Sequence, residues 1–446
     1  MEQFKRKIAE RCAEKGITEY EIYYEIGEST SVSIHRQQIN QFTSSVEGGL
    51  CFRCMVNGRM GYASTESLNS EQAYQLVDRA VDNAAVLETE DAQFLGEGNQ
   101  TYEVLERQLY DLPTTEELIA TALDTQQAIY DADSRVVDGT STQCLREKSE
   151  IGIWNSKGLN LSYVNQIAGI VTAAVVSDNG EMANDAKIRL GALATIDGKA
   201  LAAETVAGAL EKLGGQTAPT GVYPVVFSPK AMAELLKTFS GCFSSDAAQK
   251  GLSPLADKEG HSIGSAVLTI VDDPFHPQNP MPMPFDAEGS PTARKAVVEG
   301  GVLKTLLYNL KSAHKAGCKT TGNASKGGYN SAIGVQPFTM YIAAGEVASE
   351  ELLRQAGEGV YVDALHGTHA GTDGVSGDFS IQSTGYLIQN GEKTTRIKGF
   401  TVAGNFYELL KKITAVADDL ELPMPLGMTT FGSPTVLVEG LSIAGK

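Results

Sequence analysis

The stretch GVYPVVFSPKAMAELLKTFSGCFSSD, residues 221–246, predicts a buried strand that runs directly into a helix. Residues 222–227 form a short apolar run rich in β-branched side chains, which is typical of a strand in a core. Ser228 and Pro229 supply a capping hydroxyl and a first-turn proline, the usual signals of a helix start. The apolar residues that follow recur at helical spacing, so one face of helix 229–240 should pack inward: Ala231, Leu235, Leu236 and Phe239.

The length of 446 residues predicts about three domains, and 42% hydrophobic residues are enough for ordinary buried cores. We expect an N-terminal α+β domain at 1–110, a middle α+β domain at 111–216 and a C-terminal β-rich domain at 217–446. Residues 214–219, GGQTAP, are the composition break that marks the main boundary. The fold class is therefore α+β, with hairpins and helices first and then a mostly antiparallel β domain with short helices.

Charge and composition exclude two classes of partner. Acidic residues outnumber basic ones 55 to 36, and no Lys/Arg run could follow a phosphate backbone, so we expect no nucleic-acid binding. No segment approaches the ~18 apolar residues of a membrane span, and residues 1–16 read as an amphipathic helix rather than a signal peptide. Six cysteines scattered along the chain are not a disulfide framework. These features predict a cytoplasmic protein that does not bind membranes.

The first half reads as hairpins flanked by helices. Residues 19–26 and 31–39 are strand-like, and 41–63 continues with Gly48-Gly49 and Asn57-Gly58 as turn signals. The segment LCFRCMV, which contains Cys51 and Cys54, alternates apolar and polar residues like a strand, whereas redox CxxC pairs open helices, so strand cysteines are favoured over a redox pair. Helices are expected at 70–87, 113–131 and 196–213, and a second hairpin at 143–155 and 159–176.

The second half predicts several more strands and one long loop. Strands are expected near 266–271, 338–343, 359–364, 379–389, 393–397 and 435–443, a hairpin at 296–306, and short helices at 309–316, 349–355 and 405–413. Residues 274–292 gather six of the fifteen prolines in one loop, a composition and length that favour a functional loop.

Few motifs carry chemistry by themselves. There is no HExxH and no phosphate-binding GxxxxGK[ST]. His366 and His369 are the only close histidine pair, and Asp373 and Asp378 follow as possible oxygen ligands. This glycine-rich loop is either an alternative metal site or a loop whose histidines hydrogen-bond to backbone.

Four longer stretches resemble the TldD/PmbA family of metallopeptidases, also described as modulators of DNA gyrase. They are PFDAEGSPTARK (284–295), TTGNASKGGYN (320–330), SGDFSIQSTGYLIQNGEKTTRIKGFTVAGNF (376–406) and GSPTVLVEGLSIAGK (432–446). Residues in the first hundred fit as well, so the resemblance covers nearly the whole chain. It implies a cytosolic peptidase system in which a TldD-type subunit holds zinc and a TldE/PmbA-type subunit accompanies it.

The zinc motif of the catalytic members is absent here. The resemblance places HExxxH in the register of residues 237–242, where this chain has Lys237, Thr238 and Cys242 in place of the motif's histidines and glutamate. The family's third ligand, a cysteine near the C-terminus, is also missing, since no cysteine follows Cys318 and a residue near Leu420 takes its place. An ammonium has no lone pair for a metal, so we expect no catalytic residue and no zinc in this chain.

The resemblance therefore implies a non-catalytic pseudoenzyme subunit, a heterodimer with a TldD-type chain or a homodimer when alone, acting on extended unfolded peptides. Two alternatives stay open. One is a metallopeptidase in its own right that uses His366, His369 and an acidic residue on a different metal, and the other is a protein-binding regulator related to gyrase modulation.

Overall fold

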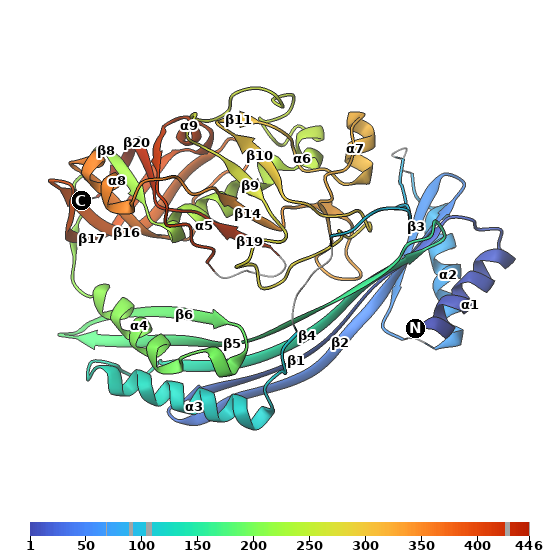
Figure 1. The fold of residues 1–446 in the computed structure, drawn as a ribbon, viewed down its shortest axis with the longest axis horizontal. Helices are drawn as coiled ribbons and strands as arrows, with labels where there is room; N and C mark the ends of the chain where they lie inside the picture. The colour runs from blue at the N-terminus through green and yellow to red at the C-terminus, as the bar shows by residue number, and fades with distance from the viewer. Residues whose placement is uncertain (68, 89–91, 104–108, 424–428, 446) are drawn as a thin grey trace. The chain divides into compact units, whose positions relative to one another are not determined.

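The computed structural model describes all residues except 68, 89–91, 104–108, 424–428 and 446, and it forms two compact units (Figure 1). The first unit contains Met1–Gly214, Pro280–Pro291 and Ser325–Ile333, and the second contains Gly215–Asn279, Thr292–Ala324 and Gly334–Lys446. Two segments from the sequence of the expected C-terminal domain thus belong to the first unit.

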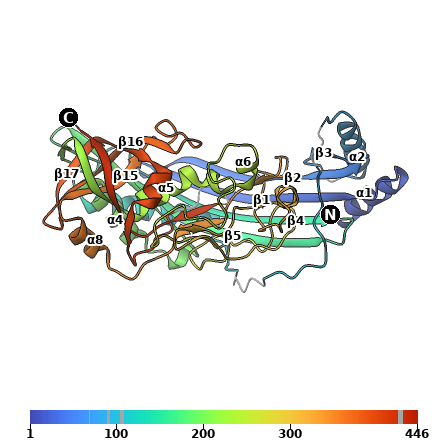
Figure 2. The ribbon, with the colours of Figure 1, turned by 90° about the horizontal axis from the view of Figure 1, so that it is seen from above.

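A six-stranded antiparallel sheet in the order β3-β2-β1-β4-β5-β6 forms the first unit. Its strands are β1 (Tyr20–His35), β2 (Gln38–Val56), β3 (Arg59–Thr65), β4 (Ser141–Asn155), β5 (Asn160–Asp178) and β6 (Glu181–Leu190). Figure 2 shows the long strands β1, β2, β4 and β5 side by side. The first two expected domains therefore share one sheet, with β1 paired to both β2 and β4.

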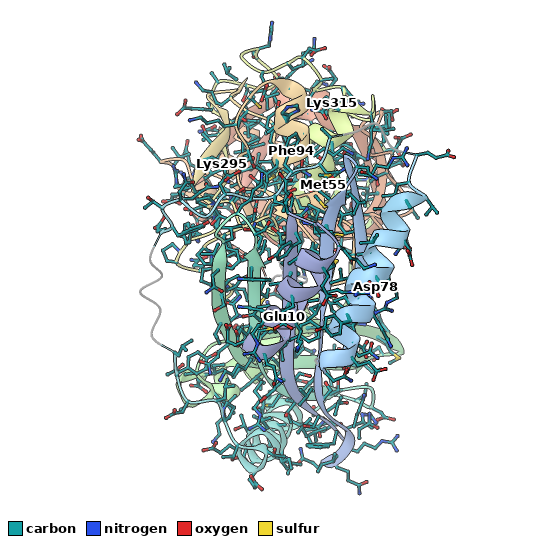
Figure 3. The ribbon with its side chains drawn as sticks, turned by 90° about the vertical axis from the view of Figure 1, so that its right-hand side faces the viewer. Glu10, Met55, Asp78, Phe94, Lys295 and Lys315 are labelled. Atoms are coloured by element: carbon teal, nitrogen blue, oxygen red, sulfur yellow. The ribbon has the colours of Figure 1, made fainter. Side chains whose placement is uncertain are left out.

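Four helices cover one face of this sheet, in two pairs. They are α1 (Glu2–Glu14), α2 (Ser70–Ala85), α3 (Thr115–Ala132) and α4 (Gly198–Glu211). Buried even-numbered residues of β1 meet α1 and α2 at one end of the sheet, through Ile22, and α3 and α4 at the other, through Val32. Figure 3 shows α1 and α2 side by side, and Arg11 of α1 forms an ion pair with Asp78 of α2.

The opposite face of the sheet buries charge. Arg53 of β2 contacts Glu21 of β1 at 2.6 Å, and both side chains are at least 95% buried. The segment 280–291 packs on the same unit, where the Phe285 ring lies edge-on 5.0 Å from that of Tyr163. The proline-rich loop predicted at 274–292 is thus buried over most of its second half.

The second unit is built on a closed barrel. β8 (Gly221–Phe227) pairs in parallel with β15 (Gly359–His366) and antiparallel with β20 (Val436–Ala444). The remaining pairings close the ring, because β15 pairs with β16 (Asp378–Gln389), β16 with β17 (Glu392–Asn405), and β17 with β20. β18 (Ile413–Val416) and β7 (Gln216–Thr217) extend the barrel, at β20 and β17 respectively.

A second sheet of the same unit lies against α5 (Pro229–Phe239), in the order β11-β10-β9-β14-β19. Its strands are β9 (Ile270–Asp272), β10 (Lys295–Glu299), β11 (Val302–Leu303), β14 (Thr339–Ile342) and β19 (Thr430–Gly432). The shorter elements are η1 (Leu193–Thr195), η2 (Ser240–Phe243), α6 (Ser245–Gln249), α7 (Leu310–Ala316), α8 (Ser349–Ala356), α9 (Phe406–Lys411), β12 (Ala324–Ser325) and β13 (Gly334–Val335). Since α5 also contacts β8 and β15, it lies between the two sheets of its unit.

The α+β class and most of the expected elements are confirmed, but some details were wrong. The strand-like segment at 19–26 and most of that at 31–39 form one strand that ends at His35, a turn at residues 36–37 was not expected, and β6 was missed. Gly48 and Gly49 lie inside β2 rather than at a turn. A Cβ on Gly48 would stand 2.4 Å from the Glu25 carbonyl oxygen, and one on Gly49 would stand 2.5 Å from the Tyr329 ring. Both glycines are there because neighbours approach the strand closely.

Candidate functional site

The helix that the family register points to is fixed at both ends. At its start, Ser228 Oγ accepts the amide N–H of Ala231 (3.1 Å) and donates to the Asp363 carbonyl (2.7 Å), which ties α5 to β15. At its end, Phe239 stacks on Phe406 with ring centroids 4.6 Å apart. The chain then tightens into the 3₁₀ turn η2, so residues 237–242 do not follow one regular helix.

A carboxylate that the sequence did not single out occupies the exposed side of this helix. Glu234 accepts from Lys237 Nζ at 3.2 Å and from Thr368 Oγ1 at 3.2 Å. Thr368 lies in the loop after β15, so the loop with the two candidate histidines does reach α5. Lys237 therefore forms an ion pair with the carboxylate of Glu234.

Cys242 faces the core instead of this cluster. Its side chain is part of the main hydrophobic cluster of the unit and only 2% exposed. Burial raises the pKa of the thiol, which lies beside the Tyr407 hydroxyl. Thr238 uses its hydroxyl within the helix, donating to the Glu234 carbonyl at 2.7 Å. The structure therefore does not bring Lys237, Thr238 and Cys242 together as a set of ligands.

These residues do not fit a zinc ion. Zinc in proteins needs three or four deprotonated Cys, His or carboxylate ligands that converge on one point. Here Lys237 offers an ammonium, and the Cys242 thiol is buried, which raises its pKa and disfavours the thiolate that a zinc ligand needs. Leu420, which follows β18 and is half-buried, has no donor atom in its side chain.

The alternative site in the loop after β15 is dispersed among turn contacts. Asp373 accepts the amides of Val375 (2.8 Å) and Ser376 (3.0 Å), and these bonds lower its pKa. Asp378 accepts from Asn405 Nδ2 at 2.9 Å. Among the residues with described positions, no three His, Cys, Asp or Glu side chains are grouped as a metal would need.

His366 and His369, the histidines of that loop, are both exposed. His366 Nε2 lies 3.5 Å from Thr384 Oγ1. Both imidazoles are thus exposed to solvent, whereas Asp373 and Asp378 accept hydrogen bonds from neighbouring residues.

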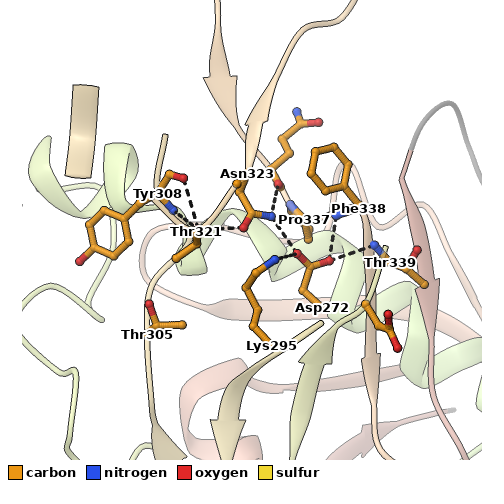
Figure 4. A network of polar contacts seen from close by, with 12 residues as sticks. Asp272, Lys295, Thr305, Tyr308, Thr321, Asn323, Pro337, Phe338 and Thr339 are labelled. Atoms are coloured by element: carbon orange, nitrogen blue, oxygen red, sulfur yellow. Dashed lines mark hydrogen bonds and ion pairs between the residues drawn. The ribbon is translucent and has the colours of Figure 1, made fainter. Parts of the chain in front are cut away.

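A buried carboxylate network lies in the second sheet of this unit, around Asp272 of β9 (Figure 4). Asp272 is fully buried and accepts from Lys295 Nζ (3.2 Å) and Asn323 Nδ2 (2.7 Å). It also accepts the amides of Phe338 (2.9 Å) and Thr339 (3.0 Å), so each of its oxygens has two donors. Because both oxygens already accept two hydrogen bonds from groups of this chain, this carboxylate connects neighbouring segments and cannot accept a further hydrogen bond from a substrate.

A cavity of about 580 Å³ opens at the other end of α5. Pro229, the first residues of α8, the turn after β16 and Asp419 are among its lining. The Lys393 ammonium lies 3.4 Å from the centre of the Tyr361 ring, which forms one wall. Its walls mix acids, two bases and one aromatic ring.

Sequence reasoning missed Glu234, Thr368, Asp272 and the Glu21–Arg53 pair. Arg53 had one readable signal, because it is a charged residue inside an otherwise apolar strand run, whereas Asp272 ends a short apolar strand and is followed by Asp273 and Pro274. Glu234 and Thr368 had none, because they are far apart in the sequence and meet only through the barrel.

Comparison with known proteins identifies the family of this fold. Models described as PmbA/TldA metallopeptidase domain 1, central domain and C-terminal domain match residues 20–84, 110–213 and 220–445. Metalloprotease PmbA of Escherichia coli O157:H7 is 25% identical over 428 residues, which cover 93% of this chain and 90% of that protein.

Solved structures have the same fold. A proposed modulator of a DNA gyrase from Thermotoga maritima is 28% identical, with a TM-score of 0.88 over 99% of this chain and 100% of that one. TldE from Thermococcus kodakarensis is 23% identical, with a TM-score of 0.86 over 98% of each chain.

The barrel and the long sheet, matched over nearly their whole length, define a protein of a metallopeptidase family. The chain belongs to the PmbA/TldD family. No helix within the described ranges is long and apolar enough to cross a membrane.

Proposed function

We propose that this chain is a non-catalytic TldE/PmbA-type subunit of a cytosolic zinc metallopeptidase complex that processes unfolded peptides. A TldD-type partner holds the zinc, and this chain contributes the second half of the assembly. The observation that carries the proposal is the Lys237–Glu234 ion pair, at 3.2 Å, in the register where catalytic members carry their first histidine.

Three further features support it. Cys242 is in the core, where burial raises the pKa of its thiol, and both carboxylate oxygens of the buried Asp272 accept hydrogen bonds from groups of this chain. Relatives of this chain include metalloproteases of the PmbA and TldD types, and one solved structure with this fold is a TldE, so both subunit types that the proposal names occur among proteins similar to this chain.

The metal content of the purified chain tests this proposal. We expect elemental analysis of protein prepared without a metal-affinity tag to find almost no zinc. A TldD-type chain prepared in the same way is the control, with about one zinc per chain. About one zinc per chain here, retained through mild chelation, would overturn the proposal.

The partner is tested separately. On the proposal, this chain self-associates when alone and prefers a TldD-type chain when both are co-expressed. Size-exclusion chromatography of the co-expressed pair should give one peak that contains both. Separate elution at micromolar concentration would remove the partner from the proposal.

A further inference from the structure

One edge of the six-stranded sheet is open over a long stretch of β2. β3 covers β2 only at residues 50–56, and no other described strand is paired with the outer edge of residues 41–49. The only irregularity in the pairing of β1 with β2 falls at Asn40, outside this stretch. A row of amides and carbonyls that pair with no strand among the described residues therefore faces outward from a regular strand.

The side chains of this edge leave apolar surface uncovered. In the β1–β2 register, Phe42 lies opposite Val32, and Val32 is buried under α3. Phe42 is nevertheless 49% exposed, and Val46, on the same face, is 74% exposed. The apolar face that α3 covers over β1 thus continues onto β2, where no described helix covers Phe42 and Val46.

The edge also lacks the usual protection against strand pairing. Natural sheets guard their edges with lysine, proline, bulges or short strands. Residues 41–47, QFTSSVE, contain one charge and no lysine or proline. The opposite edge of the same sheet, β6, carries the charged residues Glu181, Asp185, Lys187 and Arg189.

The register fixes which backbone groups point outward. The Met55 amide donates to the Glu19 carbonyl at 2.9 Å, so odd-numbered residues of β2 face β1 with their hydrogen-bonding groups. The amides and carbonyls of Phe42, Ser44 and Val46 consequently point to the free edge. These are the same residues whose side chains lie on the uncovered face.

We propose that β2 pairs antiparallel with β2 of a second copy of this chain, with Ser44 opposite Ser44 on the two-fold axis. In this register Phe42 of each copy lies opposite Val46 of the other, an aromatic–β-branched pair on the apolar face. Glu47 lies opposite Gln41, so no like charges meet. A strand that complements itself in this way suits an isologous dimer.

This inference rests on the self-association in the proposed function and identifies the surface through which it occurs. The pairing does not depend on zinc. Sedimentation of the full-length chain should show a dimer that Phe42→Lys and Val46→Lys weaken by about tenfold or more. Met182→Lys on β6 is the matched control, since Met182 is also exposed (65%) and should leave the dimer unchanged. Circular dichroism checks that each variant is folded.

Cross-linking tests the register itself. In a Cys318→Ser background, which removes the exposed thiol, Thr43→Cys and Ser45→Cys chains should form a disulfide when mixed, because residues 43 and 45 face each other across the two-fold axis. Each variant alone should cross-link less.

Three results would overturn the inference: a monomeric wild type, a dimer indifferent to both lysine variants, or equal cross-linking by each cysteine variant alone. Such results leave the proposed partnership untouched, because co-elution with a TldD-type chain is a separate measurement. A dimer through β2 together with failed co-elution would instead count against the partnership alone.

Discussion

At the scale of residues, burial decides which candidate side chains can act. Lys237 and Cys242 share one short segment, yet the first pairs with Glu234 at the surface and the second joins the core. A residue's place in a sequence motif therefore does not fix its environment. The helix end at Phe239 and the 3₁₀ turn after it separate the two side chains.

Restoring the motif residues should not create a peptidase. Lys237→His, Thr238→Glu and Cys242→His puts an imidazole where the thiol is 2% exposed, so overpacking should destabilise the second unit by about 1–3 kcal/mol. We expect weak zinc binding and a lower melting temperature, measured by elemental analysis and calorimetry. The control is the double variant Lys237→His and Thr238→Glu, which keeps Cys242 and should have the melting temperature of the wild type. Chelator-sensitive peptide cleavage by the triple variant would contradict this expectation.

The ion pair between α1 and α2 should make stability depend on pH in acid. The Arg11 guanidinium, which donates to the carboxylate of Asp78, lowers the pKa of that group. Its stabilisation is therefore present above the unfolded-state pKa, near 3.9, and is lost as the pH falls through the lower folded-state pKa.

The variant Asp78→Asn should cost about 0.5 kcal/mol at neutral pH, since the pair is partly exposed, and the difference from wild type should vanish near pH 2. The fluorescence of Trp154, the only tryptophan, reports unfolding of this unit. The control is Asp124→Asn, which removes the same charge at an exposed position of α3. A difference that persists unchanged in acid would show that Asp78 acts through packing rather than charge.

At the scale of elements, the sequence predicted helix starts and tight turns, because these depend on residues that are close together in the chain. The helix expected at 113–131 is α3, which Thr114 caps, and the Asn57-Gly58 turn signal is a turn in which both residues have positive φ. Gly48 and Gly49 failed as turn signals because their role depends on chain segments that are distant in the sequence. Glu234 meets Thr368 for the same kind of reason, across 134 residues, and no local pattern records it.

One such packing glycine gives a sharp test. A Cβ on Gly61 of β3 would stand 1.9 Å from the Ala80 carbonyl of α2, whereas one on Gly27 of β1 would meet nothing closer than 3.9 Å. Gly61→Ala should therefore destabilise the first unit by about 1–3 kcal/mol, and Gly27→Ala by less than about 0.5 kcal/mol. Urea unfolding followed by Trp154 fluorescence measures both. Equal midpoints for the two variants would refute this account of the α2–β3 contact.

At the scale of the whole molecule, the sequence order of domains and the compact units differ. Residues 280–291 and 325–333 come from the C-terminal part of the sequence but pack in the first unit. The Lys326 ammonium lies 5.0 Å from the Tyr23 ring, and burial lowers its pKa. The composition break at residues 214–219 predicted a boundary between domains that are continuous in sequence. It gave no indication that residues 280–291 and 325–333, which follow the boundary, pack in the first unit.

The central claim is that this chain completes a metallopeptidase without holding its metal. The most direct measurement compares cleavage of an unfolded peptide by this chain alone, by a TldD-type chain alone and by the two mixed, each with and without a chelator. We predict no cleavage by this chain alone and chelator-sensitive cleavage by the mixture that exceeds that of the TldD-type chain alone. Chelator-sensitive cleavage by this chain alone, or a mixture no more active than the TldD-type chain, would contradict the account.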